Sequence, residues 1–122
     1  MKRSEWLKIH NAGKKKYESG ATKTPEYFAW IAMKGRCYNP NYGGFHNYGA
    51  RGIVVCAGIR EDFTFFRRLV GQRPSADSSI DRVDNAGSYS CGECDECAAN
   101  QWPMNLRWAT RAVQQRNTRV NN

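Results

Sequence analysis

The chain has 122 residues, which is the size of a single domain. Apolar residues make up 40% of it, the usual share for a globular protein, and no apolar run approaches the ~20 residues that a membrane span requires. These values exclude a membrane protein, a collagen-like chain and a large enzyme with a separate cofactor domain. The first residues contain no apolar segment of a secretory signal, so we expect a cytoplasmic protein with reduced cysteines.

Positive charge is concentrated at the two ends of the sequence. The net charge is +8, from 19 Lys and Arg residues against 11 Asp and Glu residues. Residues 1–20 carry six basic and two acidic side chains, residues 101–122 carry four arginines and no acid, and the middle is balanced. This distribution favours a polyanionic partner, with nucleic acid as the first candidate. The alternative is that the charge serves solubility alone.

The sequence divides into a basic arm and one folded domain. The arm is predicted to span residues 1–24, and the domain is predicted to span residues 25–119. A run of three lysines in the arm is expected to contact the polyanion: Lys14, Lys15 and Lys16.

Helix and strand signals alternate through the predicted domain. A threonine followed by a proline marks the start of the first helix, β-branched runs mark the strands, and a second threonine can cap the last helix. In chain order we predict a helix over 25–37, a turn-rich aromatic loop over 39–52, a strand over 53–56, a helix over 61–70, a strand over 79–83, a turn over 84–87, a strand over 106–109 and a helix over 110–119. The predicted fold class is therefore α+β, with a strand–loop–strand–helix unit at its C-terminal end.

Three cysteines lie within seven residues, in two overlapping Cys-x-x-Cys spacings formed by Cys91, Cys94 and Cys97. Such spacing lets the sulfur atoms converge on one tetrahedral ion, for which zinc is the usual choice. Because no open coordination position is implied, the predicted zinc is structural, and it would hold an insertion at about 88–100. The candidates for the fourth ligand are Cys56, Cys37 and His46.

Two segments of the C-terminal unit resemble a known family. Residues 79–85 read Ser-Ile-Asp-Arg-Val-Asp-Asn, and residues 105–110 read Asn-Leu-Arg-Trp-Ala-Thr. They are similar to the HNH endonucleases of the ββα-metal (His-Me finger) superfamily, in which Asp-His-Ile-Asp-Gly-Asn precedes Asn-Leu-Arg-Trp-Val-Thr. The order of shorter motifs from residue 36 onward is similar to that of small phage and bacterial HNH-like proteins. The resemblance extends over about 25–119.

The resemblance implies a metal-dependent endonuclease that hydrolyses phosphodiester bonds in double-stranded DNA with Mg²⁺ or Mn²⁺. It also implies a phage or mobile-element protein in the bacterial cytoplasm. Asp81 matches the metal ligand on the first strand, and Gln114 falls where the helix supplies the second ligand. Asn105 matches the residue that orients the loop between the strands. Arg82 falls at the position of the histidine general base.

This arginine leaves the chemistry open, because a guanidinium is always protonated and cannot accept a proton from water. His46 could act as the base while Arg82 binds the phosphate, or metal-bound water could react without a side-chain base. Alternatively, the protein is a catalytically inactive DNA-binding protein of the same fold. A simpler interpretation of residues 81–84 is a surface ion-pair patch. A protein-interaction domain, such as an inhibitor of a host enzyme, is a third class.

Arginines recur through the last strand and helix and are expected to contact DNA phosphates, while a solvated helix is the simpler interpretation. With one more from the aromatic loop, the predicted DNA-binding arginines are Arg51, Arg107, Arg111, Arg116 and Arg119. The sequence is compatible with a monomer that nicks one strand and with a homodimer that cuts both.

Overall fold

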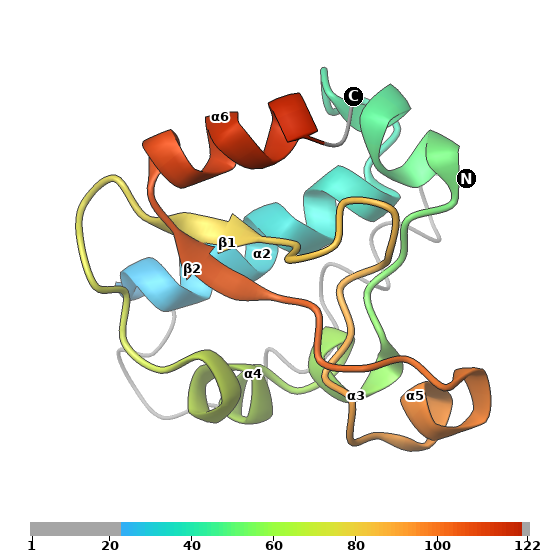
Figure 1. Cartoon of the computed structure of the whole chain (residues 1–122). Helices are drawn as coiled ribbons and strands as arrows, with labels where there is room; N and C mark the ends of the chain where they lie inside the picture. Colours follow the sequence, from blue (N-terminus) through green and yellow to red (C-terminus); the bar gives the residue numbers. More distant parts are fainter. Residues whose placement is uncertain (1–22, 121–122) are drawn as a thin grey trace.

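The computed structural model describes residues 23–120, and it describes side chains for residues 23–115 (Figure 1). No helix within the described range is long and apolar enough to cross a membrane. Five predicted DNA contacts lie outside the described residues or side chains: Lys14, Lys15, Lys16, Arg116 and Arg119.

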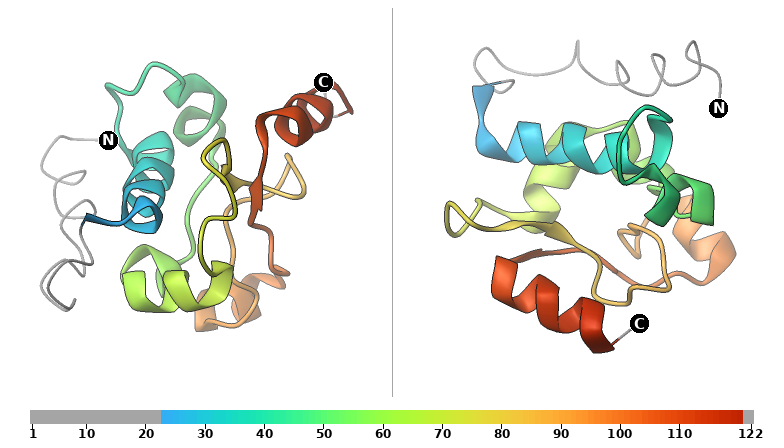
Figure 2. Two further views of the ribbon diagram at one scale, coloured as in Figure 1. Left: turned by 90° about the vertical axis from the view of Figure 1, so that its left-hand side faces the viewer. Right: turned by 90° about the horizontal axis from the view of Figure 1, so that it is seen from above.

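The described chain contains a two-stranded sheet and several helices, which confirms the α+β class. In chain order the elements are α2 (Pro25–Tyr38), η3 (Phe45–Asn47), η4 (Gly49–Arg51), α3 (Ala57–Arg60), α4 (Phe63–Val70), β1 (Ser79–Asp81), α5 (Asp95–Asn100), β2 (Arg107–Ala109) and α6 (Arg111–Val120). Figures 1 and 2 show the sheet between α2 on one side and α6 on the other, with α5 beside α3 and away from α6.

Helix α2 begins where the sequence predicts. The Thr24 hydroxyl accepts a hydrogen bond from the Tyr27 N–H at 3.2 Å, and Pro25 occupies the first helical position. Helix α4 begins two residues later than predicted, because Asp62 caps it by accepting a hydrogen bond from the Phe65 N–H at 3.1 Å. The residues before this cap form the separate short helix α3.

The two C-terminal strands pair in antiparallel register, with Ser79 opposite Ala109 and Asp81 opposite Arg107. Side chains alternate between the faces of a strand. Ile80 therefore points into the core, while Ser79 and Asp81 lie on the opposite face. β1 ends at Asp81 rather than at residue 83, since the next side chain turns inward and bonds the following turn.

The predicted strand over 53–56 is wrong. This segment forms only an isolated parallel bridge between Val55 and Tyr89. The Tyr38 hydroxyl donates to the Val55 carbonyl at 3.2 Å and accepts from the Val55 N–H at 2.9 Å, while the Val54 N–H donates to the Ser88 hydroxyl at 3.1 Å. Side chains thus occupy the backbone groups that a neighbouring strand would need.

The core fills the space between α2, α3, α4 and the inner face of the sheet. Trp30 is fully buried on α2, and its indole N–H donates to the Ile59 carbonyl at 2.6 Å. The rings of Trp30 and Phe63 lie 5.5 Å apart, which joins α2 to α4. Trp108 is half-buried on β2 and donates to the Gly71 carbonyl at 3.2 Å. The core therefore supports the sheet from the side opposite α6.

Candidate functional site

Four of the five cysteines meet in one cluster. The ligand atoms of the four all lie within 4.8 Å of one another. Of the three candidates for a fourth ligand, the structure selects Cys56, which precedes α3. Cys37 is buried in α2 and His46 is exposed on η3, both outside the cluster. The cluster itself consists of Cys56, Cys91, Cys94 and Cys97.

Backbone geometry brings the sulfur atoms together. The N–H groups of Glu93 and Cys94 donate to the Cys91 sulfur at 3.4 and 3.3 Å, and the Cys91 N–H donates to the Cys56 sulfur at 3.3 Å. Gly92 adopts a left-handed φ of 77°, and a Cβ there would lie 2.7 Å from the Met104 nitrogen. The turn between the first two cysteines of the insertion therefore requires glycine.

The insertion also contains a short helix that the sequence analysis did not predict. Cys94 precedes α5, and Glu96 in its first turn accepts a hydrogen bond from the Ala57 N–H at 2.8 Å. This bond joins α5 to the start of α3, next to Cys56. The signal for α5 was the pair of acidic residues after Cys94, which is typical of a helix N-terminus.

The donor set and spacing fit zinc. Tetrahedral zinc with Zn–S bonds of about 2.3 Å has sulfur–sulfur edges of about 3.8 Å. The sulfur atoms of Cys91 and Cys97 are 3.9 Å apart. Four cysteines complete the coordination shell without an open position, which is the pattern of a structural site rather than a catalytic one.

Electrostatics at the cluster also favour a cation. In the metal-free form, burial raises the pKa of the Cys56 thiol. Burial opposes ionisation of Cys94 as well, but hydrogen bonds from the backbone at Cys97 and Gly58 lower its pKa to about 7. A bound cation would stabilise thiolates that burial disfavours.

The predicted catalytic carboxylate lies on the sheet face beneath α6. The Asp81 side chain is 21% exposed, and its Oδ2 lies 3.4 Å from Arg107 Nη2, its ion-pair partner on β2. On the same strand face, the Ser79 hydroxyl accepts a hydrogen bond from Gln114 Nε2 at 2.6 Å. Gln114 therefore contacts β1 through Ser79, and it also donates to the Ala109 carbonyl at 2.8 Å, while Asp81 pairs with Arg107.

Arg82, which the sequence analysis matched to the general base, is a buried residue with 4% exposure. Its Nη1 donates to the carbonyls of Asn85 at 2.6 Å and Gly87 at 2.9 Å, and its Nη2 donates to Asn85 Oδ1 at 2.9 Å. The guanidinium carbon lies 5.2 Å from the centroid of the Tyr48 ring and 5.6 Å from that of the Tyr89 ring. Arg82 thus bonds the turn that directly follows β1 from the core side, and its guanidinium lies between two aromatic rings.

Asn105 holds the same turn from the β2 side. It is buried, and its Nδ2 donates to the carbonyls of Asp84 at 3.1 Å and Ser88 at 2.8 Å. Its Oδ1 accepts from the Asp84 N–H at 2.7 Å. One amide side chain therefore fixes both ends of the turn that follows β1.

The aromatic loop packs against this turn through Arg51. Its Nη2 donates to the Asn85 carbonyl at 3.4 Å, and its Nη1 donates to the Asn47 carbonyl at 3.2 Å. No hydrogen bond or ion pair joins the exposed His46 to Asp81 in the described part of the chain. Sequence reasoning missed the two tyrosines that cover Arg82, Tyr48 and Tyr89, because they come from two segments distant from Arg82 in the chain.

Comparison with protein-family models, with curated proteins and with solved structures found no match for this chain. The molecule itself offers a four-cysteine cluster, an Asp81–Arg107 ion pair across the sheet, a Gln114 side chain that bonds Ser79 on β1, and exposed arginines near this unit.

Proposed function

We propose that this protein binds double-stranded DNA through the unit formed by β1, β2 and α6, as in the HNH proteins that it resembles. The observation that carries this proposal is the placement of arginines on three separate segments around one strand pair. Arg51 contacts the turn between the strands, Arg107 lies on β2, and Arg111 begins α6. Arg51 and Arg111 are exposed, and the Arg107 side chain is 38% exposed. Guanidinium groups in this arrangement suit phosphates along a duplex backbone.

The position of the acidic residues of the insertion also supports a DNA-binding face at β1, β2 and α6. Glu93 and Asp95 are exposed beside the cysteine cluster. Figures 1 and 2 show α5 away from α6, so this negative charge lies away from the proposed DNA face. The acidic end of the domain therefore does not oppose approach of a polyanion to α6.

The proposal is tested with a fluorescent 20-base-pair duplex and the double variant Arg51→Ala, Arg111→Ala. We expect weaker binding that is uniform across duplex sequences, because phosphate contacts carry no sequence information. The slope of log affinity against log salt should become shallower by about 1.8, since two phosphate contacts are lost. The control is Arg68→Ala, which removes an exposed arginine from α4. Equal effects of the double variant and the control would contradict the proposed face.

Metal-dependent cleavage is a second candidate function, favoured by the position of Asp81 on β1, on the strand face from which Ser79 contacts Gln114 of α6. A divalent cation held there would stabilise negative charge on the scissile phosphate. Arg107 already faces the Asp81 carboxylate, so a cation would compete with this ion pair. The buried Arg82 bonds the turn and offers no proton acceptor. DNA binding without cleavage is therefore the function that we place first.

Nicking of supercoiled plasmid with Mg²⁺ or Mn²⁺ distinguishes the two candidates. If the site cleaves, Asp81→Ala should abolish nicking, because it removes the proposed ligand. The matched control is Glu61→Gln, which removes a carboxylate that also lies 3.4 Å from an arginine, on an exposed ion pair outside the sheet. DNA binding by the wild type without nicking would exclude the nuclease and leave the binding function.

We also propose that the ion at the cysteine cluster is zinc and that its role is structural. Four closely spaced sulfurs without an open coordination position support this assignment. The cluster joins the segment before α3 to the insertion that precedes β2. Zinc would thereby fix the entry into β2, and with it the position of the DNA-binding arginines.

A further inference from the structure

Two adjacent pockets lie beside β1. The first, of about 390 Å³, lies between α2 and the segment that leads into β1. The second, of about 420 Å³, lies between that segment and α6. Both pockets are lined by Arg73, Ser78 and Ser79. Because they share these residues, we refer to the two pockets together as the Arg73 groove.

The Arg73 groove is strongly basic. Arg73 lines both pockets, and its guanidinium has no hydrogen-bond or ion-pair partner among the described side chains. The other cations in the lining are Lys23, Arg36 and Arg111, against the single carboxylate of Asp77. The charge of the groove therefore complements an anionic ligand.

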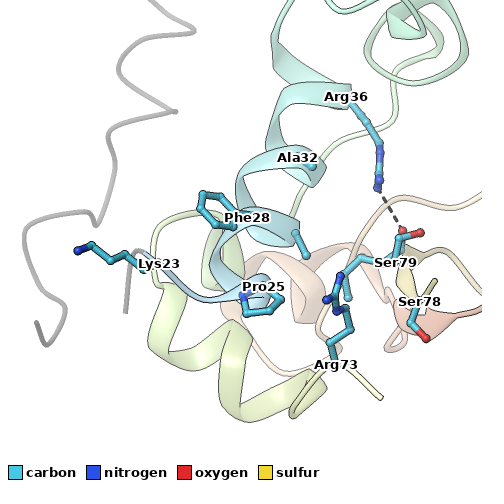
Figure 3. A pocket seen from close by; sticks show the side chains of 10 residues that line it. Lys23, Pro25, Phe28, Ala32, Arg36, Arg73, Ser78 and Ser79 are labelled. Atoms are coloured by element: carbon cyan, nitrogen blue, oxygen red, sulfur yellow. Dashed lines mark hydrogen bonds between the residues drawn. The ribbon is translucent and has the colours of Figure 1, made fainter. Parts of the chain in front are cut away.

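The first pocket also presents an aromatic surface. Figure 3 shows Phe28, Ala32 and Arg36 along one side of α2, with Arg73, Ser78 and Ser79 across from them. Phe28 lines this pocket and is 61% exposed, so its ring is open to a ligand. Arg36 donates to the Ile80 carbonyl and the Tyr89 hydroxyl, which leaves Lys23 and Arg73 as the cations that a ligand can meet here. An aromatic face beside such cations suits single-stranded nucleic acid, because bases stack on the ring while phosphates meet the cations.

We propose that the Arg73 groove binds an unpaired DNA strand, next to the duplex held by β1, β2 and α6. This inference rests on the proposed DNA-binding function and extends it from duplex to unpaired DNA. Bases stack on Phe28 in the first pocket, and backbone phosphates lie against Arg73 and then against Arg111 in the second. The basic arm over residues 1–20 is a poor occupant, because its own net positive charge would meet the cations of the groove.

The test is binding of a fluorescent ten-nucleotide thymidine strand and of the 20-base-pair duplex to the full chain. Phe28→Ala should weaken binding of the single strand at least about fivefold, and Phe28→Tyr, which keeps the aromatic face, should restore it. For the single strand, Arg73→Ala should make the slope of log affinity against log salt shallower by about 0.7. Both alanine variants should change duplex binding less than twofold. The control Arg68→Ala should change neither, and circular dichroism verifies that each variant is folded.

Duplex binding together with single-strand binding that these variants weaken supports the inference. If the duplex binds but the single strand does not, or if Phe28→Ala and Arg73→Ala leave its affinity unchanged, the groove proposal is overturned and the duplex function stands. If only the single strand binds, and with the expected variant effects, the groove is supported and the duplex function fails.

Discussion

Removal of metal by a strong chelator is expected to unfold this protein at room temperature. Structural zinc contributes about 10–16 kcal/mol in zinc-finger peptides, while a domain of this size has a net stability of about 5–15 kcal/mol. Loss of the ion would also leave four clustered sulfur groups without a counter-charge, three of them on buried residues. The measurements are metal analysis, with one zinc per chain expected, and thermal melting followed by circular dichroism with and without chelator.

Two cysteine variants supply the control for the zinc prediction. Cys94→Ser removes one ligand and should abolish stoichiometric zinc binding. Cys37→Ser changes a buried cysteine outside the cluster, so it should lower stability moderately and leave one zinc per chain. A metal-free wild-type protein that melts at the same temperature with and without chelator would show that the cluster is not a metal site.

Replacement of Arg82 by methionine is expected to lower the free energy of unfolding by about 3–5 kcal/mol. The change removes three hydrogen bonds to the turn that follows β1, and it removes the guanidinium from its position between the rings of Tyr48 and Tyr89. It also leaves the Gly87 carbonyl without the Arg82 donor and the Asn85 carbonyl with only the longer bond from Arg51. Chemical denaturation of wild type and variant measures the difference.

The control for Arg82→Met is Arg68→Met on the exposed surface of α4, for which a change within about 0.5 kcal/mol is expected. The affinity of the folded Arg82→Met protein for duplex DNA should stay close to that of the wild type. A variant as stable as the wild type but with much weaker DNA binding would instead place Arg82 at a phosphate.

Local signals in the sequence were sufficient to predict the features that depend on residues close together in the chain. Helix α2 follows from the cap formed by Thr24 and Pro25, and the positions of β1 and β2, though not their long-range pairing, follow from two short β-branched or aromatic runs. The three-cysteine spacing likewise located most of the metal cluster. In each case the residues that decide the structure are sequence neighbours or share a recognisable spacing.

Long-range contacts determined the features that could not be predicted. The run over 53–56 has the composition of a strand, but Tyr38 takes both backbone groups of Val55 from 17 residues away. The burial of Arg82 depends on Tyr48 and Tyr89, which approach from two other segments. From sequence alone, an arginine next to a strand aspartate is predicted to be a surface charge, because the two rings that bury it come from distant segments.

The salt dependence of duplex binding by the wild-type chain tests the central claim most directly. Three arginines placed around β1, β2 and α6 should give a slope of log affinity against log salt of about −2.7 or steeper, because each phosphate contact contributes about −0.9. Such a slope, made shallower by the Arg51→Ala, Arg111→Ala double variant, is the predicted result. An absence of binding at low salt, or an affinity that does not change with salt, would contradict a DNA-binding function.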